Sequence, residues 1–218
     1  MRRIKLLSLV LGLLLAGTLA SAAMAHQPYF EEIDIEATNP REVEDPSIST
    51  AVYATLDTRS DADYISFEGL IGEVILVELT IPQIEGQEDF APTMVLMGPG
   101  LPYADLPDSV AVPEGAGALV IEPPLGPAPT FYEPFSRTSY WERQEQRVTL
   151  PAGGQYTVAV WHPSGEVGRY VFVIGEREVL GGDLAFPLKM RSYWTPVEAP
   201  AADPEPQHAP KGSPCGAW

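Results

Sequence analysis

The chain has 218 residues, of which 45% are hydrophobic, and its 30 acidic and 13 basic side chains give a formal net charge of −17. Such an acidic surface repels the phosphates of nucleic acids, so nucleic-acid binding is excluded as a function. The single cysteine, Cys215, excludes an intramolecular disulfide, and the fold must therefore be stabilised by its core.

A secretory leader is predicted at residues 1–25. A basic region (2–5) precedes an almost wholly apolar run (6–20), and "AMA" (23–25) places small residues at −3 and −1 of a cleavage site. The apolar run is shorter than the roughly 20 residues that span a bilayer. We therefore expect cleavage after Ala25, no transmembrane segment in the mature chain, and a secreted or periplasmic location. The mature chain keeps 10 basic and 30 acidic side chains, a formal charge of −20.

Composition divides the mature chain into three parts. Residues 26–49 are acidic and Pro-containing, which predicts a largely extended lead-in with a candidate edge strand at "YFEEIDIE". Residues 50–194 hold the periodic segments and form the predicted domain. Residues 195–218 are rich in Pro and Ala, which predicts a disordered tail.

The predicted domain contains about eight strands and hardly any helical period. Apolar and polar residues alternate in short runs, and the segments between these runs are rich in Gly, Pro, Asp and Ser. The predicted strands are 50–56, 63–67, 73–81, 93–97, 117–122, 147–150, 155–161 and 169–175. Short strands joined by turns predict an all-β fold, an antiparallel β-sandwich with jelly-roll or Greek-key character. Long Pro-rich loops at 98–115 and 122–135 offer binding surfaces.

Two passages resemble the pre-peptidase C-terminal (PPC) type of secreted β-sandwich. They are "LDTRSDADYISFEGLIGEVILVELTIP" and "LPAGGQYTVAVWHPSGEVGRYVFVIG", and the resemblance covers residues 48–175. The positions that carry it are Asp61, Asp63, Tyr64, Phe67, Gly154, Tyr156, Val160, Gly168 and Tyr170. The resemblance implies a non-catalytic domain that assists export, localisation or substrate binding, although no enzyme domain accompanies it here.

Sequence signatures of catalysis are missing. The chain has no G-x-S-x-G, no S-x-x-K and no H-E-x-x-H, and it contains only three histidines. Its many carboxylates are explained by a solvated acidic surface. We therefore favour a binding protein over an enzyme, and oxidative copper chemistry stays open as an alternative.

A calcium loop is one candidate metal site. "DTRSDADYISFE" places Asp57, Asp61 and Glu68 at positions 1, 5 and 12 of the EF-hand pattern, but Arg59 occupies position 3 and Ala62 the position that needs Gly. A hairpin turn in which Asp side chains cap backbone amides is the favoured interpretation. The alternative is a weak surface Ca²⁺ site made of Asp57, Asp61 and Asp63.

Copper is the second candidate metal. Cleavage after Ala25 leaves His26 with a free α-amine, and an N-terminal His can chelate through this amine and its ring Nδ1. A second His would complete a tetragonal nitrogen set of the kind that Cu(II) prefers, an arrangement called a histidine brace. His162, at the end of a predicted strand, is the better partner, and His208, in the predicted tail, is the poorer one. The alternative is that His26 only follows the cut and His162 caps a turn.

An aromatic segment is the third candidate site. "FYEPFSRTSYWERQ" (131–144) contains Phe131, Tyr132, Phe135, Tyr140 and Trp141, with Glu133 and Arg137 between them. A ligand-binding platform would use Tyr132, Glu133, Arg137, Tyr140 and Trp141. The favoured alternative is a loop that its own rings hold against the sandwich.

Three functions are compatible with the sequence. The leading one is an exported, non-catalytic binding or accessory protein that recognises a protein, peptide or carbohydrate through its loops. The second is a copper-binding protein that uses His26, for copper carriage or oxidative chemistry. The third is an envelope-associated structural protein tethered through the tail and Cys215.

Overall fold

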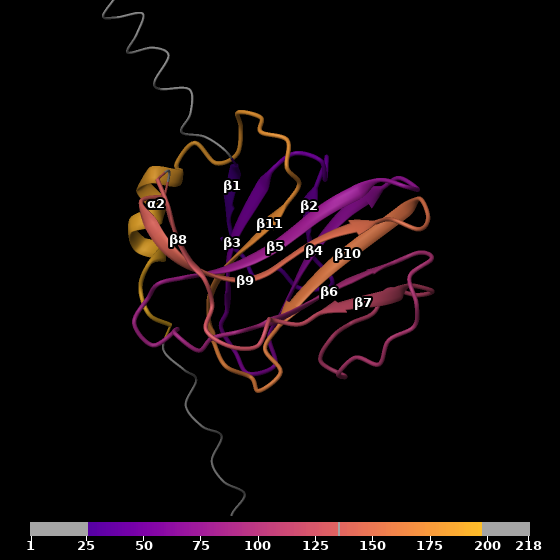
Figure 1. Ribbon diagram of the computed structural model, residues 1–218, viewed down its shortest axis with the longest axis horizontal. Coiled ribbons are helices and arrows are strands. Elements are labelled where there is room, and N and C mark those ends of the chain that lie inside the picture. The colour runs from indigo at the N-terminus through magenta and orange to yellow at the C-terminus, as the bar shows by residue number, and fades with distance from the viewer. Residues whose placement is uncertain (1–25, 135, 198–218) are drawn as a thin grey trace, which may run out of the picture.

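Two β-sheets pack face to face, as the predicted sandwich requires (Figure 1). The structure is a computed structural model that describes residues 26–134 and 136–197. The predicted leader, His208 and Cys215 lie outside the described residues. Within the described part, eleven strands and one helix are present, compared with the eight strands predicted.

The larger sheet has six strands in the order β1-β3-β11-β5-β9-β8. Their bounds are β1 Gln27–Phe30, β3 Thr50–Leu56, β5 Val74–Pro82, β8 Thr130–Glu133, β9 Thr138–Thr149 and β11 Gly168–Ile174. The smaller sheet has five strands in the order β2-β4-β10-β6-β7. Their bounds are β2 Arg41–Val43, β4 Ala62–Gly69, β6 Thr93–Gly98, β7 Gly117–Ile121 and β10 Gly154–Trp161.

The core lies between the sheets because alternate residues of each strand point inward. In β4, Ile65 and Phe67 are fully buried, and Phe67 stacks on Tyr156 of β10 with ring centroids 5.7 Å apart. Phe172 and Ile174 of β11 belong to the same buried cluster. Each such side chain contributes about 1.5–3 kcal/mol on burial, which stabilises a fold without a disulfide among the described residues.

The lead-in forms two edge strands, whereas one was expected, at 29–36; β1 overlaps the start of that stretch and β2 is the additional strand. β1 pairs with β3 and β2 pairs with β4, and both pairs are parallel. Parallel neighbours need a crossover connection, and residues 31–49, which include β2, provide it between β1 and β3. The sandwich is therefore antiparallel in its interior and has one parallel edge strand in each sheet.

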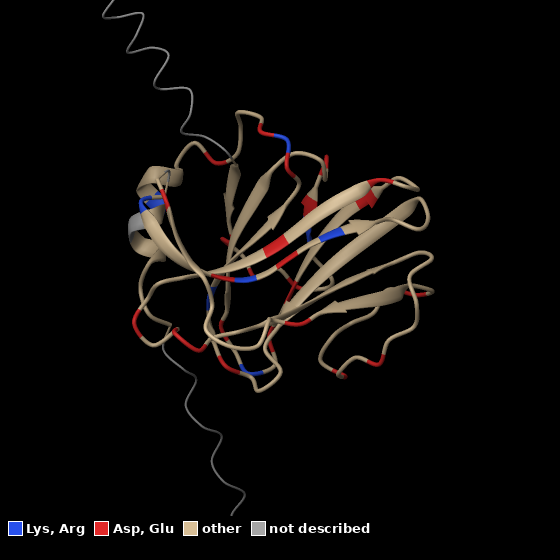
Figure 2. Cartoon of the chain, in the orientation of Figure 1, with Lys and Arg blue, Asp and Glu red and all other residues tan. Residues whose placement is uncertain are grey.

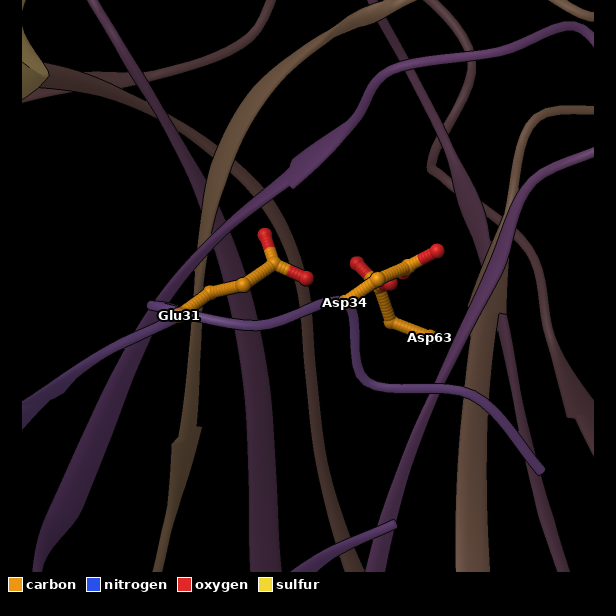
Figure 3. Close-up of side chains that lie close together, drawn as sticks. All are labelled: Glu31, Asp34 and Asp63. Carbon is orange, nitrogen blue, oxygen red and sulfur yellow. The ribbon is translucent and has the colours of Figure 1, made fainter. Parts of the chain in front are cut away.

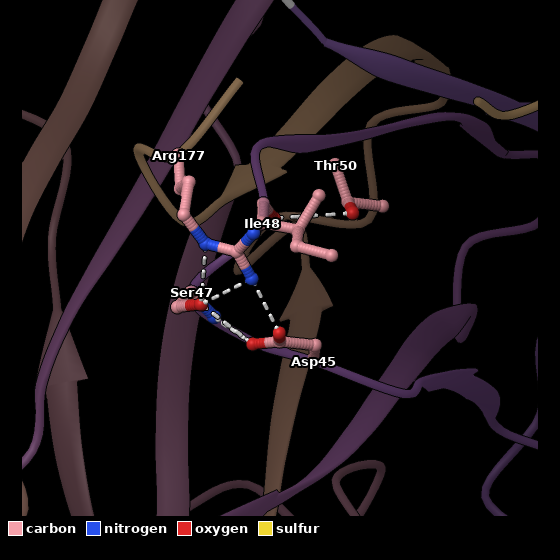
Figure 4. A network of polar contacts seen from close by, with 5 residues as sticks. All are labelled: Asp45, Ser47, Ile48, Thr50 and Arg177. Atoms are coloured by element: carbon pink, nitrogen blue, oxygen red, sulfur yellow. Dashed lines mark hydrogen bonds and ion pairs between the residues drawn. The ribbon is translucent and has the colours of Figure 1, made fainter. Parts of the chain in front are cut away.

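A polar network fixes the return of the chain from β2 to β3 (Figure 4). Arg177, which follows β11, donates to the Asp45 carboxylate at 2.6 Å, and its backbone N–H donates to the Ser47 carbonyl at 2.9 Å. The Ser47 hydroxyl donates to the other Asp45 oxygen at 2.6 Å. Hydrogen bonds from Ser47, and then the charge of Arg177, lower the pKa of Asp45.

Helix α2 (Phe186–Tyr193) covers the outer face of the six-stranded sheet, where no helix was expected (Figure 1). Phe186, Met190 and Tyr193 are buried against Tyr53 and its neighbours. The Tyr193 hydroxyl donates to the Ala54 carbonyl and, at 3.1 Å, to that of Tyr170. The helix has only eight residues and Pro in its first turn, so its apolar period is too short to recognise in the sequence.

Acidic side chains are distributed over both sheets and most loops, whereas Lys and Arg are few (Figure 2). Among the described residues, no helix is long and apolar enough to cross a membrane. The Pro-rich segment after β6 covers the outer face of the smaller sheet, where Val110 packs with Tyr64 and Trp161.

The packing of α2 predicts a large effect of Phe186→Ala. Phe186 is 3% exposed and its ring lies 5.5 Å from that of Tyr53, so truncation should lower the free energy of unfolding by about 3 kcal/mol. Leu188→Ala, on the exposed side of the same helix, should change it by less than about 0.5 kcal/mol. Urea unfolding followed by tryptophan fluorescence measures both. Equal stability of the two variants would show that α2 does not pack on the sheet.

Candidate cation site

Three carboxylates meet where the lead-in crosses from the larger sheet to the smaller one. Glu31 and Asp34 lie in the segment between β1 and β2 (residues 31–40), which we call the crossing segment. Asp63 lies in β4 (Figure 3). One oxygen from each carboxylate lies within 4.8 Å of the others. Asp63 is fully buried, Glu31 is half-buried and Asp34 is exposed, so the group extends from the core to the surface.

Backbone amides hold Glu31 in place. Its own N–H donates to the Tyr53 carbonyl at 2.9 Å, which continues the pairing of β1 with β3. Its carboxylate accepts from the Thr55 N–H at 2.8 Å and from the Ile35 N–H at 3.3 Å. The side chain thus joins the end of β3 to the crossing segment.

Asp63 points into the sandwich on the same side of β4 as Ile65 and Phe67, because residues two apart share a face. Its Oδ2 accepts a hydrogen bond from the buried Tyr170 hydroxyl at 2.5 Å. Its Oδ1 is buried and has no hydrogen-bond partner among the described residues. A buried carboxylate oxygen without a partner costs free energy, so this atom is the one that a ligand would stabilise most.

A turn places two further carboxylates nearby. Asp57 and Asp61 lie between β3 and β4, and the Asp61 carboxylate accepts from the Asp57 N–H at 2.7 Å. This is the predicted cap of a backbone amide by an Asp side chain. The turn joins the two sheets and is not the hairpin that was expected, because β3 and β4 belong to different sheets.

Burial is the largest cause of the raised carboxyl pKa values in this site. It raises the pKa of Asp63 far above the usual range, with the charge of Glu31 as the next cause, while the hydrogen bond from Tyr170 opposes the shift. Burial also raises the pKa of Glu31, and it raises that of Asp61 to about 6. Burial and the charges of Asp57 and Glu36 raise the pKa of Asp34. The described residues place no cation here to offset this repulsion, so these carboxyl groups, and Asp63 above all, hold their protons to higher pH than ordinary carboxyl groups do.

The spacing of the oxygens fits one bound cation. Ca²⁺ takes oxygen ligands at roughly 2.3–2.6 Å, so two oxygens on the same ion are at most about 5 Å apart. The oxygens of Glu31, Asp34 and Asp63 satisfy this limit. The donor set is oxygen only, which suits Ca²⁺ or Mg²⁺ and does not suit Zn²⁺ or copper.

Only one of the three predicted calcium ligands, Asp63, belongs to this cluster. Glu31 and Asp34 come from the lead-in, which sequence reasoning treated as a solvated acidic segment. The sequence did carry a signal for Asp63, since the alternation of Asp63, Ile65 and Phe67 places its carboxylate on the core face. No local pattern connects it with residues about 30 positions earlier.

The two histidines of the predicted copper site lie at opposite ends of the sandwich. His26 Nδ1 lies 2.5 Å from the hydroxyl of Ser49, which precedes β3. His162 stacks on Phe90 at 5.3 Å, and that ring lies against Gly168, which pairs with Leu56, the last residue of β3.

The length of β3, about 20 Å, separates the two rings. Within the described residues, His26 therefore has no second histidine nearby, and the predicted pairing of His26 with His162 stays a prediction that this arrangement does not support. Burial lowers the pKa of both imidazoles. The Nδ1 of His162 instead accepts from the Ser164 and Glu166 backbone amides, each at 3.3 Å, which is the turn cap offered as the alternative.

The aromatic segment forms a hairpin of β8 and β9 at the edge of the larger sheet. Tyr140 is buried and stacks on Phe131, and Trp141 packs against the main core, so most of the rings hold the hairpin in place. Tyr132 is 59% exposed. The turn contains Arg137, which has a positive φ of 55°, and the Glu133 carboxylate accepts from the Ser136 N–H. Phe135 lies outside the described residues.

No protein-family model matches the chain, and no curated protein matches it in sequence. Solved structures of similar fold include the PPC domain of a Bacillus anthracis collagenase. It is 11% identical, with a TM-score of 0.36, over 66% of this chain and 99% of that one.

Two further solved structures are similar in fold. The periplasmic inhibitor of g-type lysozyme from Aeromonas hydrophila, PliG, is 13% identical, with a TM-score of 0.33, over 69% of this chain and 96% of that one. The surface-associated copper-binding protein CorA of Methylomicrobium album BG8 is 9% identical, with a TM-score of 0.33, over 70% of this chain and 98% of that one. These sequence identities and TM-scores are too low to assign a function to this chain.

The raised carboxyl pKa values predict that the metal-free protein loses stability as pH rises. The folded state holds protons that the unfolded state releases near pH 4, so the free energy of unfolding falls between about pH 4 and pH 8. Asp63→Asn removes the most buried of these groups. In the presence of a chelator it should raise the free energy of unfolding at pH 8 by roughly 2 kcal/mol and change it little at pH 4.

The matched control is Asp108→Asn, in an exposed loop, which should leave the pH profile unchanged. Denaturant unfolding at several pH values makes the comparison. A loss of stability at pH 8 in Asp63→Asn would mean that the ionised carboxylate is already well stabilised without a metal.

Proposed function

We propose that this protein is an exported, non-catalytic β-sandwich that binds a calcium ion through Glu31, Asp34 and Asp63. The observation that carries the proposal is the buried Asp63 carboxylate, whose Oδ1 has no partner among the described residues and which lies beside two further carboxylates within ligand distance. A cation supplies both the missing partner and the missing positive charge.

Calcium fits this set better than other metals. Three carboxylates offer up to six oxygens, and Ca²⁺ accepts six to eight oxygen ligands in flexible geometry. Mg²⁺ requires a nearly ideal octahedron and keeps several waters, which a carboxylate buried like Asp63 cannot easily accommodate. Binding requires the three groups to lose their protons, so affinity should rise with pH.

The bound ion would join the lead-in to the smaller sheet. Glu31 and Asp34 belong to the lead-in and Asp63 to a central strand of the smaller sheet, so one ion holds the crossing segment against the sandwich. Without it, the same segment is held by a few hydrogen bonds, among them the 2.8 Å bond from the Tyr64 N–H to the Ile35 carbonyl. Extracellular modules bind Ca²⁺ with dissociation constants of roughly 10⁻⁴–10⁻³ M, the range we expect here.

This proposal narrows the binding role expected from the sequence. Copper through His26 has no second histidine within the described residues. A platform of Tyr132, Glu133, Arg137, Tyr140 and Trp141 would require rings that are instead packed, with Tyr132 as the exposed member. The carboxylate cluster supports a ligand-binding role better, because it combines a buried oxygen that has no partner among the described residues with oxygens spaced for one cation.

Calcium should therefore stabilise the mature chain that begins at His26. At 100 times the dissociation constant, the gain in the free energy of unfolding should be about 2.7 kcal/mol, seen as a rise in melting temperature at pH 7.5. Asp63→Asn and Asp34→Asn should abolish or strongly reduce this gain, and Asp108→Asn should retain it. Isothermal titration calorimetry in two buffers of different ionisation enthalpy should detect protons released on binding.

Mg²⁺ serves as the test of selectivity and should give a smaller shift at the same concentration. An equal response of Asp63→Asn and the unsubstituted protein to Ca²⁺ would refute the assigned site. An equal rise in melting temperature with all divalent ions and in all variants would mean that the ions only screen the acidic surface.

A further inference from the structure

A groove of about 810 Å³ lies between the two edge strands of the lead-in. β1 is an edge strand of the larger sheet and β2 is an edge strand of the smaller sheet. The crossing segment links them. The floor is apolar and buried, formed by Ile35, Val43 and Val52. The volume is within the roughly 300–1,000 Å³ of sites that enclose ligands.

Carboxylates dominate the walls. Six line the groove: Glu31, Glu32, Glu42, Glu44, Asp45 and Asp183. Three of these are already paired, because Lys189 bridges Glu32 and Asp183, and Arg177 binds Asp45. Glu42 and Glu44 are exposed and form no ion pair with any described residue.

One cationic side chain, Arg41, lines the groove beside these carboxylates. Its guanidinium lies over the ring of Tyr29, 4.0 Å from the centroid, and its Nε is buried without a hydrogen bond from the described residues. The guanidinium is therefore held by an aromatic face and not by a carboxylate. The groove keeps an excess of negative charge that is available to a ligand.

The wall that carries Glu42 is also the free edge of a sheet. β2 pairs with β4 on one side only, so the N–H and C=O groups on the other side of its backbone have no partner strand, and all three of its residues line the groove. An extended polypeptide can hydrogen-bond to such an edge as an added strand, while its side chains occupy pockets on either side.

We propose that the groove binds an extended segment of another protein that carries Lys or Arg side chains. The segment would lie along β2, with its cationic side chains near Glu42 and Glu44 and the alternate, uncharged side chains over the floor. A second copy of this chain is a poor occupant, because two surfaces of formal charge −20 repel each other. The proposal stands on the groove and the free edge, and it does not depend on calcium binding.

The probe is a fluorescein-labelled nonapeptide of alternating Thr and Lys, and the measurement is fluorescence anisotropy on the chain from His26. Saturable binding is expected, together with none for the matching peptide of Thr and Glu. The double variant Glu42→Gln/Glu44→Gln should weaken binding about five- to tenfold at low salt. Its matched control, Glu85→Gln/Glu114→Gln, removes the same charge from exposed loops and should leave affinity unchanged.

Two arms separate a docked strand from simple charge attraction. Methylation of alternate backbone nitrogens of the peptide should abolish binding if the segment pairs with β2, because it removes the donors without changing charge. Spermidine should compete only at much higher concentration than unlabelled peptide. Equal weakening by both double variants, no effect of methylation, or equal competition by spermidine would overturn the proposal.

The readout separates this proposal from the calcium site. Glu42 and Glu44 are not among the calcium ligands, so Glu42→Gln/Glu44→Gln should keep the calcium-dependent rise in melting temperature. Conversely, loss of calcium binding in Asp63→Asn leaves both glutamates in the groove. Sedimentation of the chain alone tests whether a second copy of the chain occupies the groove. A dimer that becomes more stable in Glu42→Gln/Glu44→Gln would assign the groove to self-association instead.

Discussion

Two sets of hydrogen bonds hold the lead-in across one open side of the sandwich, and both candidate sites depend on them. The Glu31 carboxylate accepts from the Thr55 N–H, and the Ile35 carbonyl accepts from the Tyr64 N–H, so the segment is attached to both sheets. These bonds place Glu31 and Asp34 beside Asp63, and they also set the distance between β1 and β2. A cation site and a groove therefore share one scaffold.

The acidity of the chain acts at two levels. On the surface, excess negative charge is solvated and contributes little to any single contact. Inside the carboxylate cluster the same charge is desolvated, and the raised pKa values of Glu31, Asp61 and Asp63 record its cost. A protein that buries acidic groups in this way gains most from a cation, whether it is a metal ion or the side chain of a partner.

Most of the sandwich could be predicted from sequence because local alternation determines which strands exist. β3 was predicted with its observed bounds, and β10 and β11 to within one residue, since Val, Tyr and Ile alternate there with smaller or polar residues. The edge strands β1 and β2 were missed as a pair because their stability comes from pairing in parallel with distant strands, and acidic side chains mask their pattern. Helix α2 was missed because one buried face of eight residues is a weak signal.

The candidate site was predicted less well than the fold, and for a physical reason. Asp63 was singled out, but as part of a surface loop with Asp57 and Asp61, whereas its strand turns it inward toward Tyr170. Its neighbours Glu31 and Asp34 are brought close by a chain crossing, and no spacing rule encodes a crossing. The sequence also could not show that His26 and His162 lie at opposite ends of the sandwich, because their separation is set by the direction of β3.

The contact of β1 with α2 also has a consequence for folding. The first described strand packs beneath the last described helix, where Phe30 meets Phe186 with ring centroids 5.6 Å apart. During synthesis, which begins at the amino terminus, β1 cannot make this contact until α2 has left the ribosome. Closure of the outer aromatic cluster is thus a late event in folding, and it carries the loop-closure entropy of nearly the whole described chain.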